Sequence, residues 1–523
     1  MKKYISIMLV TLVAVGSSCK KDYLNLTANP NVPSKTTPDL ALAGALKTTA
    51  DIVNGGDYVQ YAAWVGYLSQ STGFQPFTNV EQYQFTSNDF NGPWNDTFGN
   101  LSNYNALLQS TTEPNYQAIA KIMMAYDYEA LVDNYNDVPY SQALQGVKYL
   151  NPAYDKGPAI YADLMKQLDA AITLIQGAPA TALTPTTADI MYGGDMGNWL
   201  KLANTLKLRL CIRVTNVASL LSTFTTAVQA TSSLGYIDGS NAALVNPGYL
   251  NTDANGGQES PLWRYYGFNQ AGSPQGGRQQ YQANSFATNF YASTNDPRIA
   301  QVYSVSTTAG AETATGLSAG MAINVYNGQA IVSTTFGDSQ PPLGTIGGKA
   351  GTQIAPSLIG TGLLVSATQS ATILSSAESL FLQSEATARG ILTGGAAGAA
   401  DLYAAGITAS FEFDQVPDAD NAAATYVAQA SVAYPAGGTL DDQVKAIITQ
   451  KWAALDVFGA FEAFNENRRT GYPAVPTSIY QGANAPNQVA RIFYPIIEYQ
   501  TNAGSVAAEG TIDKFTSKIF WAK

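Results

Sequence analysis

The sequence predicts a mainly α-helical fold, and three observations support this fold class. Apolar residues recur with a helical period over residues 40–220 and again over 371–523. The predicted helices come in pairs of similar length with Ala and Tyr at facing positions, which favours stacking of helix pairs as in a solenoid. Residues 221–370 are instead rich in Gly, Pro, Asn, Ser and Thr, so we expect mostly loops, hairpins and short helices there.

Six helices are predicted in the first helical part. We place them at residues 39–53, 57–70, 94–110, 113–133, 158–175 and 199–217. Pro114 lies in the first turn of the fourth helix, where proline is tolerated because the N–H that it lacks has no helical partner.

The second helical part begins with a predicted helix over residues 371–390, and Gly390 is a natural cap for its end. Further along, Thr439 and Asp442 have the spacing of a capping box and predict the start of the helical stretch 439–473.

The first 18 residues have the pattern of an export signal. Two lysines precede an apolar run from Ile5 to Val15, and the small residues 16–18 lead directly to Cys19. This run is shorter than the roughly 20 apolar residues that span a bilayer. A cysteine at this place predicts lipidation of its thiol. The alternative is an ordinary signal peptide followed by a chance cysteine, and Gly16 stands where a lipoprotein signal usually has leucine.

These features divide the chain into three segments. Residues 1–18 are the predicted signal peptide, and residues 19–39 are the lipid anchor with a Pro- and Asn-rich tether. Residues 40–523 form one body, in which 40–220 and 371–523 make a helical scaffold. Residues 221–370 form a loop-rich insert that we expect on the ligand side.

Composition excludes several classes of protein. Histidine is absent, which removes Ser-His-Asp and Cys-His catalysis and every His-ligated metal site. Cys211 is the only cysteine besides Cys19, so we predict no disulfide, no thiolate metal cluster and no cofactor. The net charge is −11 and there is no dense basic patch, so we predict no nucleic-acid partner. A carboxylate pair is the one common catalytic strategy that remains open.

Two irregular segments combine aromatic rings with polar neighbours, as a binder of sugars requires. The first, 74–83, has Phe74, Phe77 and Tyr83 beside Gln and Asn. The second, 263–281, contributes the candidates Trp263, Tyr265, Tyr266 and Phe268. Binding residues concentrate on loops held by a rigid scaffold. The alternative is that these rings only pack loops onto helices.

Other prominent side chains are assigned to the fold. Trp94, Trp199 and Trp452 lie on periodic helices, so we expect them in the core. Arg468 and Arg469 lie close to two glutamates, Glu462 and Glu466, and predict a structural ion-pair cluster.

Several segments of the chain together resemble one family. They are LVDNYNDVPYSQALQG (131–146), PAYDKGPAIYADLMKQLDAAI (152–172), WLKLANTLKLRLCIR (199–213), NDPRI (295–299), SAESLFLQSEATARG (376–390), FEAFNENRRTGYP (461–473) and RIFYPIIEYQTN (491–502). Together with Cys19 and its tether they resemble the SusD/RagB family of outer-membrane nutrient-binding lipoproteins, and most of all its SusD-like branch. Asp296 and Arg298 are also assigned to the fold, because their segment matches a turn of this family.

The resemblance implies a fold and a role. It implies a right-handed superhelix of tetratricopeptide-like helix pairs with an irregular, loop-rich half packed on it. It also implies a lipid-anchored protein at the outer-membrane surface of a Gram-negative cell, which is not an enzyme. Such proteins capture oligosaccharides, or in some members peptides, and act as the lid of a SusC-like TonB-dependent transporter. Ligand contacts in the family come from loops in about the two aromatic regions.

Two functions of other classes stay open. A secreted all-α glycoside hydrolase would need only a carboxylate pair as acid and base, and Glu259 near Trp263 is the one residue that suggests it. A purely structural helical scaffold without a ligand is the second. The identity of the ligand is not encoded in the spacing of the aromatic residues.

Overall fold

The computed structural model describes residues 37–59, 61–70, 79–80, 83–304, 325–326, 329–330, 358–477 and 487–523. The predicted signal peptide, Cys19 and most of the tether lie outside these residues. Within them the chain is mainly helical, as predicted. No helix of this described part is both long enough and apolar enough to cross a membrane.

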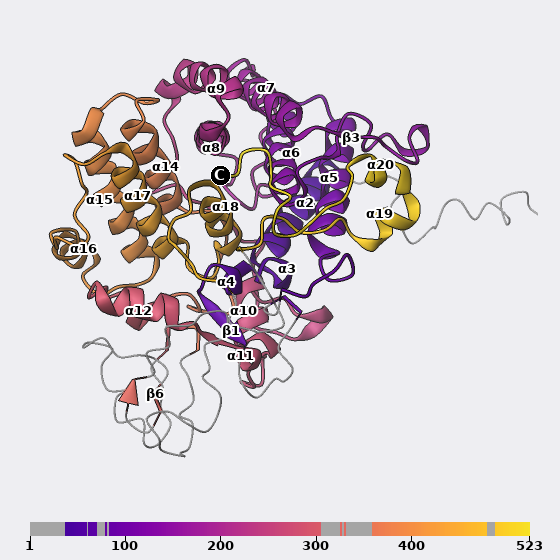
Figure 1. The fold of residues 1–523 in the computed structure, drawn as a ribbon. Helices are drawn as coiled ribbons and strands as arrows, with labels where there is room; N and C mark the ends of the chain where they lie inside the picture. The colour runs from indigo at the N-terminus through magenta and orange to yellow at the C-terminus, as the bar shows by residue number, and fades with distance from the viewer. Residues whose placement is uncertain are drawn as a thin grey trace, which may run out of the picture.

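The N-terminal half stacks its long helices one against the next (Figure 1). They are α2 (Pro38–Asn54), α5 (Gly92–Ser110), α6 (Pro114–Tyr135), α7 (Gly157–Gln176), α8 (Met196–Arg213) and α9 (Ala218–Thr231). Proline occupies the first turn of α2, α5, α6 and α7, where its missing N–H has no cost. Helices α6 and α8 are buried on nearly all sides, whereas α2 and α7 bury one apolar face against their neighbours.

The C-terminal half contains a second group of helices. They are α14 (Ser376–Ala388), α15 (Gly395–Phe413), α16 (Ala419–Val427), α17 (Leu440–Leu455) and α18 (Ala460–Thr470). Helix α14 packs against both α15 and α17. It also contacts α8, and α18 contacts the short helices α3 (Gly56–Val59) and α4 (Tyr61–Trp64). In Figure 1 the two halves therefore meet around α8, α14 and α18. The handedness of a superhelix stays a prediction.

Two predicted helix boundaries were wrong. Residues Ala371–Leu374 form strand β8, which pairs antiparallel with β4 (Ala243–Val245), and the helix begins only at Ser376. The predicted helix 57–70 divides into α3, α4 and strand β1 (Leu68–Gln70). β1 pairs with β5 (Tyr281–Ala283). In both places a distant segment offers backbone partners, and this outweighs a local helical pattern.

The remaining elements are short. Two more antiparallel pairs join β2 (Val138–Pro139) with β3 (Tyr154–Asp155), and β6 (Val325–Tyr326) with β7 (Gln329–Ala330). The other short helices are α10 (Pro261–Tyr266), α11 (Gly276–Gln280), α12 (Ser285–Ser293), α13 (Ile299–Val302), α19 (Ile496–Thr501), α20 (Ala503–Ala508), η1 (Gly146–Lys148), η2 (Val214–Asn216), η3 (Ser232–Leu234) and η4 (Ala254–Gly256).

The predicted core residues are buried. Trp94, Trp199 and Trp452 are all inside, which confirms the prediction from helical periodicity. Trp452 shows how the core joins distant parts of the chain. Its ring stacks on Tyr67 at 5.1 Å between centroids, and its indole N–H donates to the carbonyl of Val65 at 2.9 Å.

The predicted helix caps are also present. The Thr439 hydroxyl accepts from the backbone N–H of Asp442, while the Asp442 carboxylate accepts from the backbone N–H of Thr439, which completes a capping box. Gly390 follows α14 with φ of +71°, the left-handed conformation that favours glycine at a helix end.

Candidate ligand-binding site

The segment with the predicted aromatic candidates is folded into a compact hairpin at α10 and α11. An isolated antiparallel bridge joins Phe268 with Pro274. The indole N–H of Trp263 donates to the carbonyl of Phe268 at 2.8 Å, and the two ring centroids are 6.1 Å apart. Both side chains are half-buried, so each retains an accessible part. The exposed residues 270–274 lie directly beside them.

Arg278 of α11 completes this hairpin. Its guanidinium carbon lies 4.6 Å from the centroid of the Phe268 ring, and Nη1 donates to the carbonyls of Tyr266 and Ile359 at 3.4 and 3.3 Å. Burial lowers the pKa of the guanidinium. No sequence signal pointed to Arg278, because it follows Phe268 by ten positions and no periodic pattern links the two.

Tyr265 is held against the backbone of two glycines. A Cβ atom at Gly277 would lie 2.5 Å from its ring, and one at Gly56 would lie 2.8 Å away. A side chain at either position would displace the ring, so these glycines fix where Tyr265 lies. Tyr265 is half-buried, like Trp263.

Two of the predicted site residues are buried instead. Tyr266 is 0% exposed, and Tyr83 is 3% exposed with its hydroxyl donating to Gln488 at 2.7 Å. Burial of this degree favours the packing interpretation for both and argues against direct contact with a ligand in this conformation. Phe74 and Phe77 lie outside the described residues. Trp263, Tyr265 and Phe268 stay predictions as ligand contacts.

Glu259, the residue that suggested a hydrolase, is 1% exposed. Neither carboxylate oxygen has a hydrogen-bond partner among the described residues. The neighbouring Arg264 pairs with Asp51 at 3.3 Å. A general acid must reach the glycosidic oxygen of a substrate, so the burial of Glu259 argues against that role.

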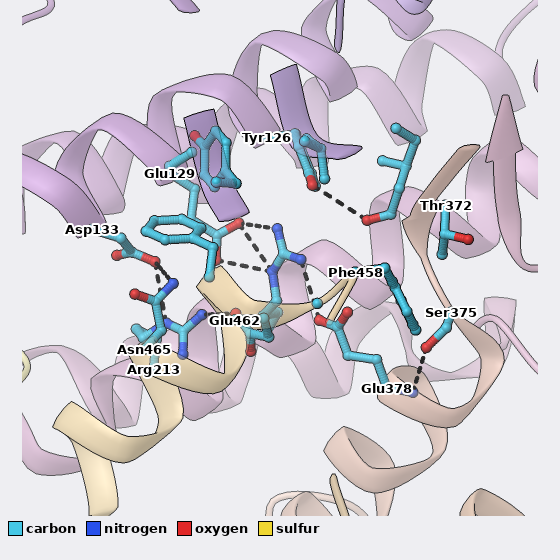
Figure 2. Close-up of a pocket in the computed structure, with 17 residues that line it drawn as sticks. Tyr126, Glu129, Asp133, Arg213, Thr372, Ser375, Glu378, Phe458, Glu462 and Asn465 are labelled. Carbon is cyan, nitrogen blue, oxygen red and sulfur yellow. Dashed lines mark hydrogen bonds and ion pairs between the residues drawn. The ribbon is translucent and has the colours of Figure 1, made fainter. Parts of the chain in front are cut away.

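A cavity of about 50 Å³ lies where the two halves of the molecule meet. It is lined by Tyr126, Glu129, Arg213, Phe458 and Glu462, among others, and Figure 2 shows its charged side chains turned toward one another. One water occupies about 30 Å³ of liquid, so this cavity is too small for a sugar ring.

The charges around this cavity form what we call the central ion-pair cluster. Its members are Glu129, Asp133, Arg209, Arg213, Glu378, Lys451, Glu462 and Glu466. Arg209 pairs with Glu129 at 2.6 Å and with Glu378 at 3.3 Å. Arg213 pairs with Glu462, and Lys451 lies 2.7 Å from that same carboxylate.

Two carboxyls of this cluster have pKa values that are shifted in opposite directions. Burial alone would raise the pKa of Glu462, but the charges of Arg213 and Lys451 outweigh it and hold the pKa well below its usual range. Burial and the nearby charge of Glu462 raise the pKa of Glu378 to about 7, although Arg209 opposes this.

Arg468 and Arg469 were both predicted to form ion pairs. Of the two, only Arg469 does so among the described residues. Arg469 pairs with Glu466 at 2.5 Å and with Glu385 at 2.6 Å. Arg468 instead donates to the carbonyls of Asp133 and Ala490. The expected pair of Asp296 and Arg298 is also present, at 2.6 Å and fully buried. These groups hold helices together and present no open surface. In the described part of the chain, no group of three or more acidic or cysteine side chains is placed to hold a metal ion.

Comparisons with known proteins give one consistent result. A SusD-like family model, described as starch-binding and associating with the outer membrane, matches residues 30–495. A search of curated protein sequences finds no significant match.

Solved structures share the fold. A nutrient-binding outer-membrane protein from Bacteroides vulgatus superposes with a TM-score of 0.73 and 23% identity, covering 93% of this chain and 100% of its own. A SusD homologue from Bacteroides uniformis gives 0.70 and 24%, covering 92% and 99%. A chitin-binding SusD homologue from Flavobacterium johnsoniae gives 0.69 and 21%, covering 92% and 98%. Identities this low establish the fold and leave the ligand of this chain to be derived from its own residues.

Proposed function

Because this chain belongs to the SusD-like family, we propose that it is a cell-surface lipoprotein that captures oligosaccharide nutrients. In this proposal, it delivers them to a SusC-like TonB-dependent transporter of the outer membrane, over which it acts as a lid. Cys19 provides the lipid anchor, and residues 20–39 form the tether.

One observation supports the binding role most directly. The hairpin of α10 and α11 presents half-buried Trp263, Tyr265 and Phe268 beside the polar residues Asn269 and Gln270. Sugar rings have apolar C–H faces and polar edges, so they fit accessible aromatic rings with amide groups at the side. The scaffold helices around the hairpin supply the rigidity that such a site needs.

The proposal is tested by calorimetry on the full-length protein with maltoheptaose, chitohexaose, an acidic glycan and a peptide mixture. We expect saturable binding of a neutral glycan that Trp263→Ala weakens at least about tenfold, equal to about 1.4 kcal/mol. Tyr499→Ala is the matched control, since Tyr499 is an exposed aromatic residue on the distant α19. If no glycan binds, or if both variants weaken binding equally, this site assignment is wrong.

The anchor and the partner need separate measurements. Mass spectrometry is expected to find an acylated Cys19 at the mature N-terminus, and Cys19→Ala to abolish surface display. A large β-barrel protein should co-purify from solubilised outer membranes. A mature chain that begins elsewhere would refute the anchor, and repeated purification without a barrel would refute the transporter.

The hydrolase alternative makes the opposite prediction for the same glycans. We expect chain lengths of maltoheptaose and chitohexaose to stay unchanged after incubation with the protein. Shortening that Glu259→Gln abolishes would establish an enzyme instead.

A further inference from the structure

A second concave surface lies on the helical scaffold, between α5, α6 and α7. It is a groove of about 320 Å³, within the size range of sites that bind small molecules and peptide side chains. Figure 1 shows these three helices side by side in the N-terminal half. None of the aromatic candidates in the described part of the chain lines it, so it is separate from the hairpin of α10 and α11.

The floor of the groove is apolar. Its lining includes Leu108, Met124, Tyr128, Tyr140, Leu144 and Leu164. The rings of Tyr128 and Tyr140 meet edge to face, with centroids 4.7 Å apart. Among the described lining residues, aliphatic side chains outnumber the two aromatic ones. This floor therefore suits an apolar side chain better than a sugar ring.

Leu144 is held in the groove by a strained backbone. Its φ is +60°, the left-handed region that a bulky residue other than glycine seldom adopts. Its carbonyl accepts from the side-chain amide of Asn105 on α5 at 3.4 Å. Strain of this kind persists where surrounding contacts demand it, and it is concentrated at functional surfaces.

The rim of the groove supplies hydrogen bonds and one charge. Asn105 and Gln109 are four residues apart on α5 and lie on one face of the helix. The side chain of Gln109 makes no hydrogen bond with another described residue. Carboxamides offer both a donor and an acceptor, as the backbone of an extended peptide does.

Lys121 is the single charged residue among the lining residues that the structure describes. Its ammonium group donates to the side-chain oxygen of Gln167 at 2.8 Å, and no carboxylate lies within ion-pair distance among the described residues. Gln167 in turn donates to Asp163, outside the lining. In a chain with a net charge of −11, an ammonium without an ion-pair partner at the edge of an apolar groove favours a ligand with a carboxylate.

Two exposed apolar side chains follow the groove-lining loop in the sequence. The loop that supplies Leu144 leads directly into η1, where Val147 is 91% exposed and Leu150, just after it, is 78% exposed. Asn151 donates to the carbonyl of Thr501, which ties this loop to α19. Large apolar side chains exposed together next to a groove mark a surface for contact with another protein.

We propose that the groove between α5, α6 and α7 docks an extended polypeptide segment that carries an apolar side chain next to a carboxylate. The apolar side chain enters the floor lined by Met124 and Leu144. The carboxylate pairs with Lys121, and the backbone hydrogen-bonds with Asn105 and Gln109. The inference does not depend on the glycan site.

Fluorescence anisotropy on the full-length protein tests this with two labelled hexapeptides. Each has a central leucine and aspartate, in the two possible orders, between glycine and serine residues. We expect saturable binding of at least one hexapeptide. Replacing its leucine by alanine or its aspartate by asparagine is expected to raise the dissociation constant at least about tenfold.

Three variants locate the binding. Lys121→Glu is expected to raise the dissociation constant at least about tenfold, and Met124→Trp to abolish saturation by filling the floor. Lys445→Glu is the matched control, because Lys445 is an exposed lysine on α17, and it should leave binding unchanged. Thermal unfolding checks that the variants are folded. If Met124→Trp does not fold, Lys121→Glu alone locates the binding.

Several outcomes overturn the proposal. They are absence of saturation with both hexapeptides, equal binding of the alanine-substituted peptide, or equal effects of Lys121→Glu and Lys445→Glu. Displacement of the hexapeptide by chitohexaose or maltoheptaose that persists in Trp263→Ala would show a saccharide groove instead. Trp263→Ala should leave hexapeptide binding unchanged, so failure here and failure of the glycan site are distinguishable.

Discussion

The central ion-pair cluster and the hairpin of α10 and α11 are built on opposite principles. The cluster places full charges inside the protein, where Arg213 and Lys451 are each 1% exposed and are surrounded by carboxylates. The hairpin has accessible rings and neutral amides. Only 12% of the residues are charged, and this chain uses many of those charges to join helices. Its surface is left to neutral polar and aromatic groups, which suits an uncharged polar ligand.

The largest expected effect is loss of a central charge. Arg213→Met leaves the buried carboxylates of Asp133 and Glu462 with one cation fewer, and breaking such a group typically costs about 3–5 kcal/mol of the free energy of unfolding. Urea unfolding measures it. Lys201→Met is the control, because its pair with Asp238 is partly exposed to solvent and we expect at most about 1 kcal/mol. Equal losses would contradict the special role of the cluster.

A pair of buried carboxyls makes the stability of this half of the molecule depend on pH. Asp456 and Asp414 are both 0% exposed, and the charge of Asp456 adds to burial in raising the pKa of Asp414. Burial raises the pKa of Asp456 to about 7, although Arg298 and the hydrogen bond from Tyr291 lower it. From about pH 4 to about pH 7 the unfolded carboxyl has lost its proton and the folded one retains it, so the free energy of unfolding falls as the pH rises.

Asp456→Asn removes this titration. Relative to the wild type, the variant should therefore become more stable as the pH rises from about 4 to about 7, by at most about 4 kcal/mol, and then level off. Urea unfolding at several pH values measures the difference. Asp420→Asn changes an exposed aspartate on α16. Its free energy of unfolding should depend on pH in the same way as that of the wild type. The same pH dependence for Asp456→Asn as well would show that the carboxyl is ionised when folded.

A smaller effect is expected at the exposed capping box of α17. Thr439→Ala removes the hydroxyl that accepts from Asp442, and loss of such a cap costs about 1 kcal/mol of the free energy of unfolding. Thr439→Ser keeps the hydroxyl and should be close to the wild type. Thermal unfolding measures both variants. If Thr439→Ala lost as much stability as Arg213→Met, the exposed cap and the buried charges would contribute equally to the free energy of unfolding.

The smallest effect is expected at the hairpin of α10 and α11. Phe268→Leu keeps an apolar side chain but removes the ring under Arg278, so glycan binding should weaken by about 0.5–1 kcal/mol with little change in the free energy of unfolding. Calorimetry and urea unfolding measure the two quantities. Tyr499→Leu is the matched control for binding. A loss of stability without a loss of affinity would assign Phe268 to packing alone.

Local patterns predicted much of the scaffold. Pro114, Thr439 and Gly390 mark helix ends as expected, because caps depend on residues within one turn. Ala371–Leu374 was predicted wrongly, since its strand partner Ala243–Val245 is more than a hundred residues away. No local pattern contains that partner.

The candidate site was predicted only in outline. Trp263 and Tyr266 are three residues apart on one short helix, yet Trp263 is half-buried and Tyr266 is 0% exposed. Their spacing could not separate them, because burial depends on which other segments pack on the helix. Arg278 and the groove of Lys121 and Leu144 were missed for the same reason.

By itself the sequence determined that this is a mainly helical protein of the SusD-like family, without histidine chemistry and with few charges. These properties follow from composition, helical period and segment order, all of which are written along the chain. Tertiary structure alone decided which aromatic rings stay accessible, which charges share a partner and where a groove forms. Those outcomes depend on contacts between residues far apart in the sequence, such as Arg213 with Glu462, and packing at such distances has no local signal.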